Sequence, residues 1–236
     1  GTAATNNLTA ATKKMAIHKH GILGGFKGRV GNVVGSSWKG LDVMKIRPAS
    51  VANPNTPRQR DQRSRFGLMA RFLNAQRRLI RIGFRPFAVH MTSLNAALSH
   101  NIAVAITGDY PDYLIDYSKV MLSKGDLPVM SQPVLSYADP FTVSLAWTDN
   151  SDSLGAHASD KLHLSFYHPE TGKSLGFIAC ASRSDAHFAA VIPAEWAGRQ
   201  VEVFAFFLAE SGVGSAEVSS QLSDTLYAGS LTLQQA

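Results

Sequence analysis

Six of the seven arginines between residues 60 and 81 form a predicted row whose side chains have the chemistry of anion recognition. A guanidinium group is always charged and can hold a phosphate or carboxylate through two parallel hydrogen bonds. At about 100° per residue, these side chains fall on a flank separate from the apolar stripe of a predicted helix. They are Arg60, Arg63, Arg71, Arg77, Arg78 and Arg81. We therefore predict an interaction surface, occupied either by nucleic-acid phosphates or by acidic side chains of this or another copy.

The distribution of charge along the chain favours the same kind of function. Residues 15–86 contain 15 Lys and Arg and two acidic residues, a net charge of +13. Residues 87–236 contain six Lys and Arg and 15 acidic residues, a net charge of −9. Such a division favours a polyanionic partner or attraction between copies, although solvated surface charge gives the same pattern.

We expect a non-enzymatic structural or interaction protein that self-assembles through complementary basic and acidic surfaces. Its partner is then another copy of the chain or a separate assembly protein. Polyanion binding through the arginine-rich helix, with nucleic acid as the partner, is the first alternative. Carbohydrate or ligand binding by a C-terminal β-sandwich is the second.

Residue patterns for catalysis are weak, and we predict no catalytic residue. Segment 36–39 (SSWK) matches Ser-x-x-Lys but lies in a predicted hairpin, and the sequence has no Gly-x-Ser-x-Gly elbow. Cys180 lies in an apolar strand, which is typical of a packed and inert thiol. Asp112, Asp116 and Glu202 could serve glycoside hydrolysis, but no motif pairs them.

Potential metal ligands are scattered, so we predict neither a metal site nor a cofactor. His18 and His20 could share a strand face, whereas His90 and His100 are too far apart for a one-turn helical pair. Segment 149–153 (DNSDS) offers oxygen ligands but lacks the glycine and distal glutamate of a calcium loop. A single cysteine excludes an internal disulfide, and no apolar run reaches 18 residues.

A long helix over residues 55–83 is expected to position the arginine row. Thr56 is a good N-cap, and Pro57 suits the first turn, where its missing N–H is not needed. The glycine and proline of segment 83–86 end this helix, and residues 87–107 predict a second one. Two helices joined by a short break favour an antiparallel helical hairpin.

Before the helices, segment 21–40 is dense in glycine but has no strand–GxGxxG–helix or Gly-Lys-Ser/Thr context for phosphate binding. Instead, Arg29–Ser36 and Leu41–Arg47 predict a β-hairpin. Residues 1–14 are polar and lack the apolar core of a secretory signal, so we expect an arm or a foreign remnant. The compartment stays open between the cytoplasm and export by a non-classical route.

From residue 130 onward, short alternating runs separated by turn residues predict an antiparallel sandwich. The predicted strands are Val134–Tyr137, Phe141–Thr148, Lys161–His168, Ser174–Cys180, His187–Ile192, Gln200–Ala209 and Asp224–Leu233. Trp147 and Trp196 are similar to landmarks of immunoglobulin-like and fibronectin type III-like modules. The expected fold is α+β, with an arm at 1–14, a basic hairpin-plus-helices region at 15–128 and an acidic β-sandwich at 129–236.

Four blocks of sequence carry a resemblance to a known family. They are GILGGFKGRVGNVVGSSWKG, NPNTPRQRDQRSRF, YLIDYSKVMLSKG and VSLAWTDNS. In this order they resemble a bacterial family of uncharacterised proteins, a domain-of-unknown-function family common in Bacteroidota, over residues 15–236. The resemblance implies a glycine-rich start, an arginine-rich helix and a C-terminal β domain as one unit. It implies no activity and no site residue, and residues 1–14 fall outside it.

Overall fold

The computed structural model describes residues 17–18, 26–38, 41–47, 55–209 and 221–234. Contacts divide the chain into two compact units, residues 1–54 and 55–236. This division differs from the boundary at 128/129 that composition predicted. The physical reason is that the helices pack on the C-terminal β-sheet and share a core with its strands.

The first unit contains a four-stranded antiparallel sheet in the order β1-β2-β3-β4. Its strands are β1 (Ile17–His18), β2 (Phe26–Val30), β3 (Val33–Trp38) and β4 (Leu41–Ile46). The hairpin of β3 and β4 confirms the predicted pairing, with Ser36 opposite Val43. The predicted strand Arg29–Ser36 is wrong, however, because a turn divides it.

That turn is a two-residue hairpin loop at Gly31 and Asn32, since Val30 pairs with Val33. Gly31 has φ +57°, a left-handed conformation that favours glycine. The Gly-Asn dipeptide between two valine-rich runs is a hairpin signal of its own. The glycine density of this region therefore includes a tight turn that the strand prediction overlooked.

Three helices begin the second unit: α1 (Pro57–Ala75), α2 (Arg77–Gly83) and α3 (Ser93–Val104). The predicted cap is confirmed, because the backbone N–H of Gln59 donates to Thr56 Oγ1 at 3.3 Å. The Thr56 N–H donates in return to Gln59 Oε1 at 3.2 Å, which completes a capping box.

The single predicted helix over residues 55–83 is wrong, because Gln76 separates α1 from α2. Gln76 is 2% exposed, and its Oε1 accepts a hydrogen bond from Ser165 Oγ at 2.6 Å. Ser174 Oγ donates to the carbonyl of Ala75 at 2.5 Å. Polar groups of the sheet thus hold the break in place, which no local sequence rule would indicate.

The end of α2 depends on close approach of two backbones. A Cβ atom on Gly83 would lie 2.2 Å from the carbonyl oxygen of Leu122, which is far inside van der Waals contact. The N–H of Lys124 donates to the Gly83 carbonyl at 3.2 Å. Gly83 therefore lets segment 122–124 pack against the helix end, a tighter constraint than the simple helix-ending role predicted for it.

The second predicted helix, 87–107, is shorter in the structure. It starts only after Thr92, whose Oγ1 accepts from the N–H of Asn95 at 3.1 Å as an N-cap. At its other end, β5 (Ile106–Thr107) pairs with β6 (Leu114–Ile115). Helix α3 packs beside α1 and α2, as expected for a helical hairpin whose first arm is broken.

Seven strands follow, and each overlaps one of the predicted strands. They are β7 (Ser131–Asp139), β8 (Thr142–Thr148), β9 (Lys161–His168), β10 (Lys173–Phe177), β11 (His187–Val191), β12 (Gln200–Leu208) and β13 (Leu226–Thr232). They form one sheet in the order β10-β9-β12-β13 and another in the order β11-β8-β7. The fold is therefore α+β with an immunoglobulin/fibronectin type III-like antiparallel sandwich, as predicted.

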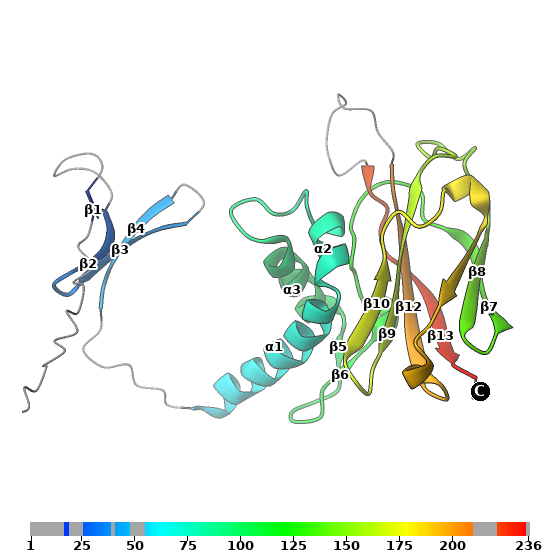
Figure 1. The fold of residues 1–236 in the computed structure, drawn as a ribbon. Helices are drawn as coiled ribbons and strands as arrows, with labels where there is room; N and C mark the ends of the chain where they lie inside the picture. The colour runs from blue at the N-terminus through cyan, green and yellow to red at the C-terminus, as the bar shows by residue number, and fades with distance from the viewer. Residues whose placement is uncertain (1–16, 19–25, 39–40, 48–54, 210–220, 235–236) are drawn as a thin grey trace, which may run out of the picture. The chain divides into compact units, whose positions relative to one another are not determined.

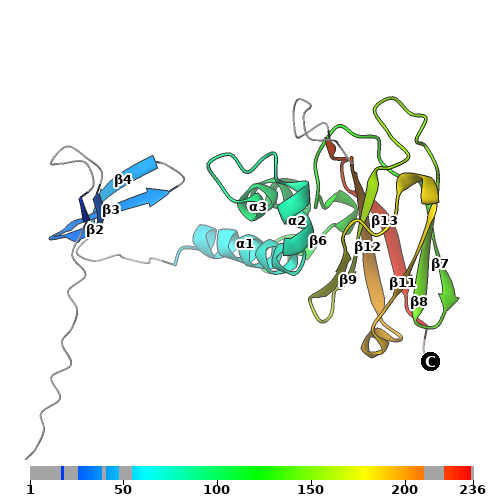
Figure 2. The same ribbon diagram turned by 45° about the horizontal axis from the view of Figure 1, so that its top comes forward.

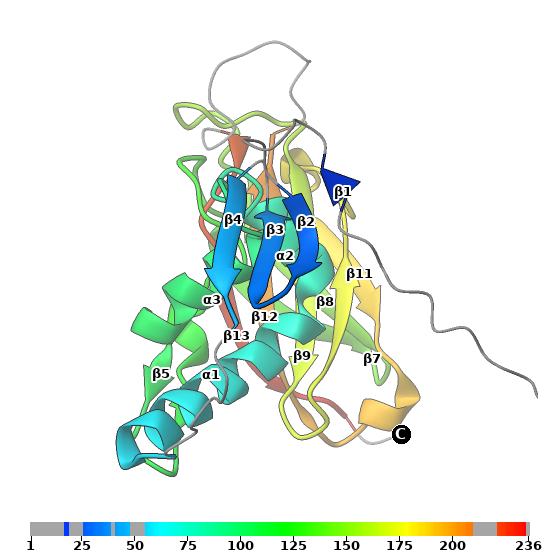
Figure 3. The same ribbon diagram turned by 90° about the vertical axis from the view of Figure 1, so that its left-hand side faces the viewer.

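The second unit has three layers: the helices, the four-stranded sheet and the three-stranded sheet (Figures 1 and 2). Figure 3 looks onto the helices, with strands of the sandwich behind them. Strand β12 shows why, because it is buried on both faces. Val203 and Phe207 belong to the core between the two sheets. Phe204 and Phe206 belong to the core between the sheet and the helices. The sandwich thus presents its four-stranded sheet to the arginine-bearing helices.

Candidate functional site

All six arginines of the predicted interaction surface are exposed. Arg60, Arg63 and Arg71 lie on α1, and the other three lie on α2. Because the helix breaks at Gln76, the six do not continue one straight helical row. Arg63 donates from Nη1 to Asn55 Oδ1 at 3.4 Å. Within the described residues, none of the other five forms an ion pair.

The structure gathers part of the row at a cavity of about 890 Å³ between α2 and the ends of β9 and β12. Its cationic side chains are Arg78, Arg81, Arg85 and Lys161. Its larger aliphatic side chains are Ile82, Ile178, Leu208 and Leu222. The three arginines are spaced by three and four residues, which places them on one side of the helix and its immediate continuation.

His163 lies in the wall of this cavity. Its imidazole is 1% exposed and stacks on the ring of Phe206, with centroids 4.9 Å apart and an interplanar angle of 8°. Among the described residues, neither Nδ1 nor Nε2 has a hydrogen-bond partner. Burial lowers the pKa of His163 to about 4, so the ring is neutral near pH 7 and offers one donor and one acceptor.

The charged side chains that line the cavity, among the described residues, are all basic. Lys161 lines the cavity and donates from Nζ to Ser182 Oγ at 3.1 Å. In the part of the chain that the structure describes, no acidic side chain lines the cavity. Because apolar walls reduce the local dielectric constant, an anion entering here is attracted more strongly than on an open surface.

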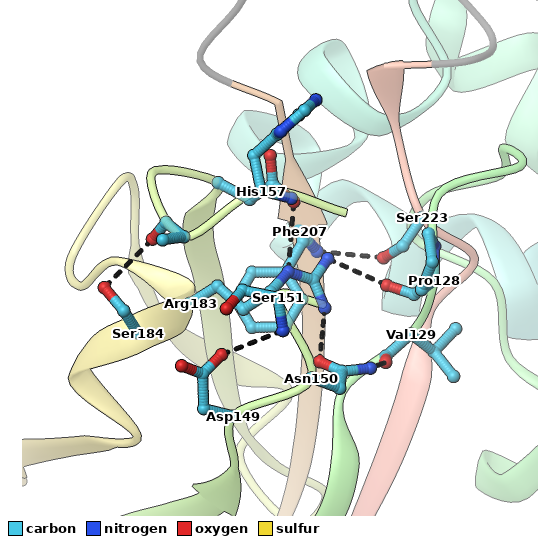
Figure 4. A network of polar contacts seen from close by, with 12 residues as sticks. Pro128, Val129, Asp149, Asn150, Ser151, His157, Arg183, Ser184, Phe207 and Ser223 are labelled. Atoms are coloured by element: carbon cyan, nitrogen blue, oxygen red, sulfur yellow. Dashed lines mark hydrogen bonds and ion pairs between the residues drawn. The ribbon is translucent and has the colours of Figure 1, made fainter. Parts of the chain in front are cut away.

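A second polar centre, around Arg183, lies inside the sandwich unit (Figure 4). Arg183 is 0% exposed, and its Nε donates to Asp160 Oδ2 at 3.0 Å. Its Nη1 donates to Asn150 Oδ1 at 2.7 Å and its Nη2 to the carbonyl of Pro128 at 2.9 Å. The guanidinium carbon lies 4.0 Å from the centre of the Phe207 ring. Every guanidinium nitrogen has a partner, so this centre holds four segments together.

The same network includes part of segment 149–153, which the sequence analysis considered as a source of calcium ligands. The side-chain oxygen of Asn150 accepts a hydrogen bond from Arg183. Asp149 Oδ1 accepts one from the N–H of Ser151 at 2.9 Å. Both groups therefore act in the turn and the buried network. Among the residues that the structure describes, no three His, Cys, Asp or Glu side chains lie close enough together to hold a metal ion.

The residues considered for catalysis make structural contacts of their own. Burial raises the pKa of the Cys180 thiol to about 12, and its Sγ lies 3.4 Å from the carbonyl of Leu162. Glu202 is buried and accepts from Tyr227 Oη at 2.5 Å, whereas Asp116 pairs with Lys119 at 2.9 Å in another segment.

The remaining members of these candidate pairs are only partly described. Ser36 and Asp112 are exposed. Lys39 and His20 lie outside the described residues, and of the side chain of His18 nothing is described.

Sequence reasoning found Arg78 and Arg81 but missed Arg85, Lys161 and His163. Arg85 lies two residues beyond the end of α2, so a helical pattern alone does not include it. Lys161 and His163 occupy the alternating positions of β9 that point away from the sandwich core. Such positions normally face solvent, so the alternating pattern predicts that both side chains lie on the surface. Only the packing of the helix layer makes them part of a cavity.

Comparison with known proteins identifies the family. The chain belongs to the family of unknown function DUF6266, whose model matches residues 25–222. No curated protein matches. Among solved structures, the chain is similar to the fibronectin type III domain of human collagen alpha-1(XX) chain, with 18% identity and a TM-score of 0.29 over 48% of this chain and 89% of that domain. In the described ranges, no helix has the length and apolar character that crossing a bilayer requires.

Proposed function

We propose that this member of the family of unknown function binds a polyanion, namely nucleic acid, through the arginine-bearing side of α1 and α2. The observation that carries the proposal is the state of the arginines. Five of the six predicted residues are exposed and form no ion pair with any described residue. Guanidinium groups in this state can bind backbone phosphates without first losing an internal partner.

Part of the acidic segment is already occupied, which favours an external anion over pairing between copies at those positions. Three of its carboxylates have cationic partners of their own. These pairs are Lys119–Asp116 at 2.9 Å, Lys173–Glu195 at 3.4 Å and Arg199–Glu170 at 2.7 Å. Arginines on α1 and α2 would have to compete for these carboxylates, whereas nucleic-acid phosphates come without such competition.

The expected mode is electrostatic and insensitive to sequence. Each phosphate neutralised by Lys or Arg releases counterions, so affinity falls steeply with salt. For about five contacts, the slope of log Kobs against log salt is about −4, and affinity falls by about two orders of magnitude between 50 and 200 mM salt.

Fluorescence anisotropy with a labelled 20-nucleotide strand and the matching duplex, at several salt concentrations, tests the proposal. The double variant Arg71→Ala/Arg77→Ala is expected to weaken binding and to reduce the salt slope by about two. Lys173→Ala/Arg199→Ala removes the same charge from the sandwich and is the matched control. An equal loss in both variants, or no binding by the unaltered chain at 50 mM salt, contradicts the proposal.

Self-assembly is the second candidate, because the second unit is itself electrically polar. Residues 55–236 contain 15 Lys and Arg and 16 acidic residues, yet nine of the basic residues lie between positions 58 and 85. Copies could attract one another through the two ends of this unit. Sedimentation velocity at 20 and 500 mM salt tests it: assembly at low salt only is expected, and a monomer in both conditions rejects it.

A further inference from the structure

We infer that the cavity between α2 and the ends of β9 and β12 binds an amphiphilic anion, with a phosphate or carboxylate head and an aliphatic body. This inference goes beyond nucleic-acid binding. It shares Arg78 and Arg81 with the polyanion proposal, and it adds the volume, the aliphatic wall and the buried imidazole of the cavity, which that proposal does not need.

The head of such a ligand is recognised by the arginine rim. Arg78, Arg81 and Arg85 all line the cavity, and none of them forms an ion pair within the described part of the chain. Their planar donor groups match the geometry of a phosphate or carboxylate. Lys161 adds a further positive charge at the same cavity. The rim therefore selects an anion and rejects a neutral or cationic head.

The body of the ligand is recognised by the aliphatic side chains that line the cavity. Ile178 is 39% exposed beside the cavity, and Leu208 and Leu222 complete an aliphatic surface with it. Apart from the imidazole of His163, no aromatic ring lines the cavity in the described residues. A nucleobase would lack a stacking platform there, whereas an alkyl chain needs only apolar contact. The volume of about 890 Å³ lies within the usual range for small-ligand sites.

His163 supplies the observation that points to a ligand. It is 1% exposed in the cavity wall, and both of its ring nitrogens lack a partner in the part of the chain that the structure describes. Buried polar groups in proteins are nearly always hydrogen-bonded, so an unsatisfied imidazole indicates a missing partner. A ligand oxygen that accepts from the imidazole N–H would satisfy it without placing a second charge in the wall.

A free amphiphile and a lipid in a bilayer share this chemistry, and two experiments separate them. Isothermal titration with decyl phosphate below its critical micelle concentration is expected to give one site per chain. Affinity should exceed that for inorganic phosphate by at least about tenfold, because the alkyl chain is removed from water. Flotation with phosphatidic acid vesicles then shows whether the same chemistry is also recognised in a membrane. Equal affinities for decyl phosphate and inorganic phosphate overturn the inference.

Two sets of variants distinguish this site from the nucleic-acid surface. Ile178→Ser changes a partly exposed side chain and should weaken decyl phosphate binding about tenfold while leaving nucleic-acid binding unchanged. Arg81→Gln/Arg85→Gln should abolish decyl phosphate binding. The matched control Arg60→Gln/Arg71→Gln lies on α1 and should weaken only nucleic acid. If Ile178→Ser leaves both decyl phosphate binding and vesicle flotation unchanged, the aliphatic wall is not a binding surface and the inference fails.

Discussion

Arg183 and the arginines of α2 place the same side chain in opposite situations. Arg183 is 0% exposed and has a partner for every guanidinium nitrogen, including the carboxylate of Asp160 at 3.0 Å. Arg78, Arg81 and Arg85 are exposed at a cavity and form no ion pair with described residues. The first arrangement completes a fold, and the second leaves charge for a partner from outside.

The difference follows from the cost of burying charge. A guanidinium taken out of water must recover its hydration from the protein, so it is tolerated only with complete hydrogen bonding. An exposed guanidinium keeps its water and needs no protein partner. Exposed arginines that gather at one cavity without carboxylates therefore add little to folding and suit ligand binding.

Removing one member of the buried pair should have the largest effect on stability. Arg183→Met leaves the Asp160 carboxylate buried without its cation and is expected to lower the free energy of unfolding by about 3–5 kcal/mol. Urea denaturation followed by intrinsic fluorescence measures this loss. The double variant Arg183→Met/Asp160→Leu should lose less than the two single changes together. A loss below about 1 kcal/mol for Arg183→Met would break the contrast with α2.

The pH dependence of stability should report the imidazole in the cavity wall. The pKa of His163 is about 4 in the folded chain against 6.5 for an ordinary histidine. Between these values the unfolded chain takes up a proton that the folded chain does not, so stability falls as the pH falls from 6.5 to 4. The complete loss of folding stability is about 3 kcal/mol, and above pH 6.5 His163 causes no such loss. The effect is intermediate in size.

Urea denaturation at pH 7.5, 5.5 and 4.5 measures this contribution, with His163→Phe as the comparison. Phenylalanine keeps the contact with Phe206 and cannot titrate, so the variant should lose less stability on acidification than the unaltered chain. Identical pH profiles for both proteins would mean that the imidazole takes up its proton as readily in the folded chain as in the unfolded chain. The cavity would then carry a further positive charge at mildly acidic pH.

Substitution on α2 should have the smallest effect on stability. Arg78→Gln/Arg81→Gln is expected to change the free energy of unfolding by no more than about 0.5 kcal/mol, because these side chains are exposed and pair with no described carboxylate. Thermal or urea denaturation of this variant beside Arg183→Met puts the two classes on one scale. A loss of 2 kcal/mol or more would assign the α2 arginines to folding and weaken both binding proposals.

Local signals predicted the parts of this molecule well. Alternation of apolar residues located all seven sandwich strands, and the Thr56–Pro57 pair located the start of α1. The helical period correctly predicted that the six arginines face away from the core. These features depend on neighbours within a few positions, where backbone geometry alone decides which side chains share a face.

Features that depend on distant residues could not be predicted in this way. At the break between α1 and α2, the buried Gln76 side chain accepts a hydrogen bond from Ser165, 89 positions further along the chain. The helix-bearing region was assigned to a different domain from the sandwich, since composition records charge but not packing partners. Segment 149–153 has the oxygen atoms of a ligand loop in the sequence. In the structure, the side chain of its Asn150 accepts a hydrogen bond from the distant Arg183.

The sequence by itself determined the seven strands of the sandwich and the start of α1, and it determined that a basic segment is followed by an acidic one. Tertiary structure alone decided that three arginines meet His163 and an aliphatic wall around one cavity. The physical reason is the distance along the chain over which each kind of interaction acts. Periodicity and capping act over a few residues, whereas a cavity forms only where helices and strands far apart in the chain are brought together by burial of apolar surface.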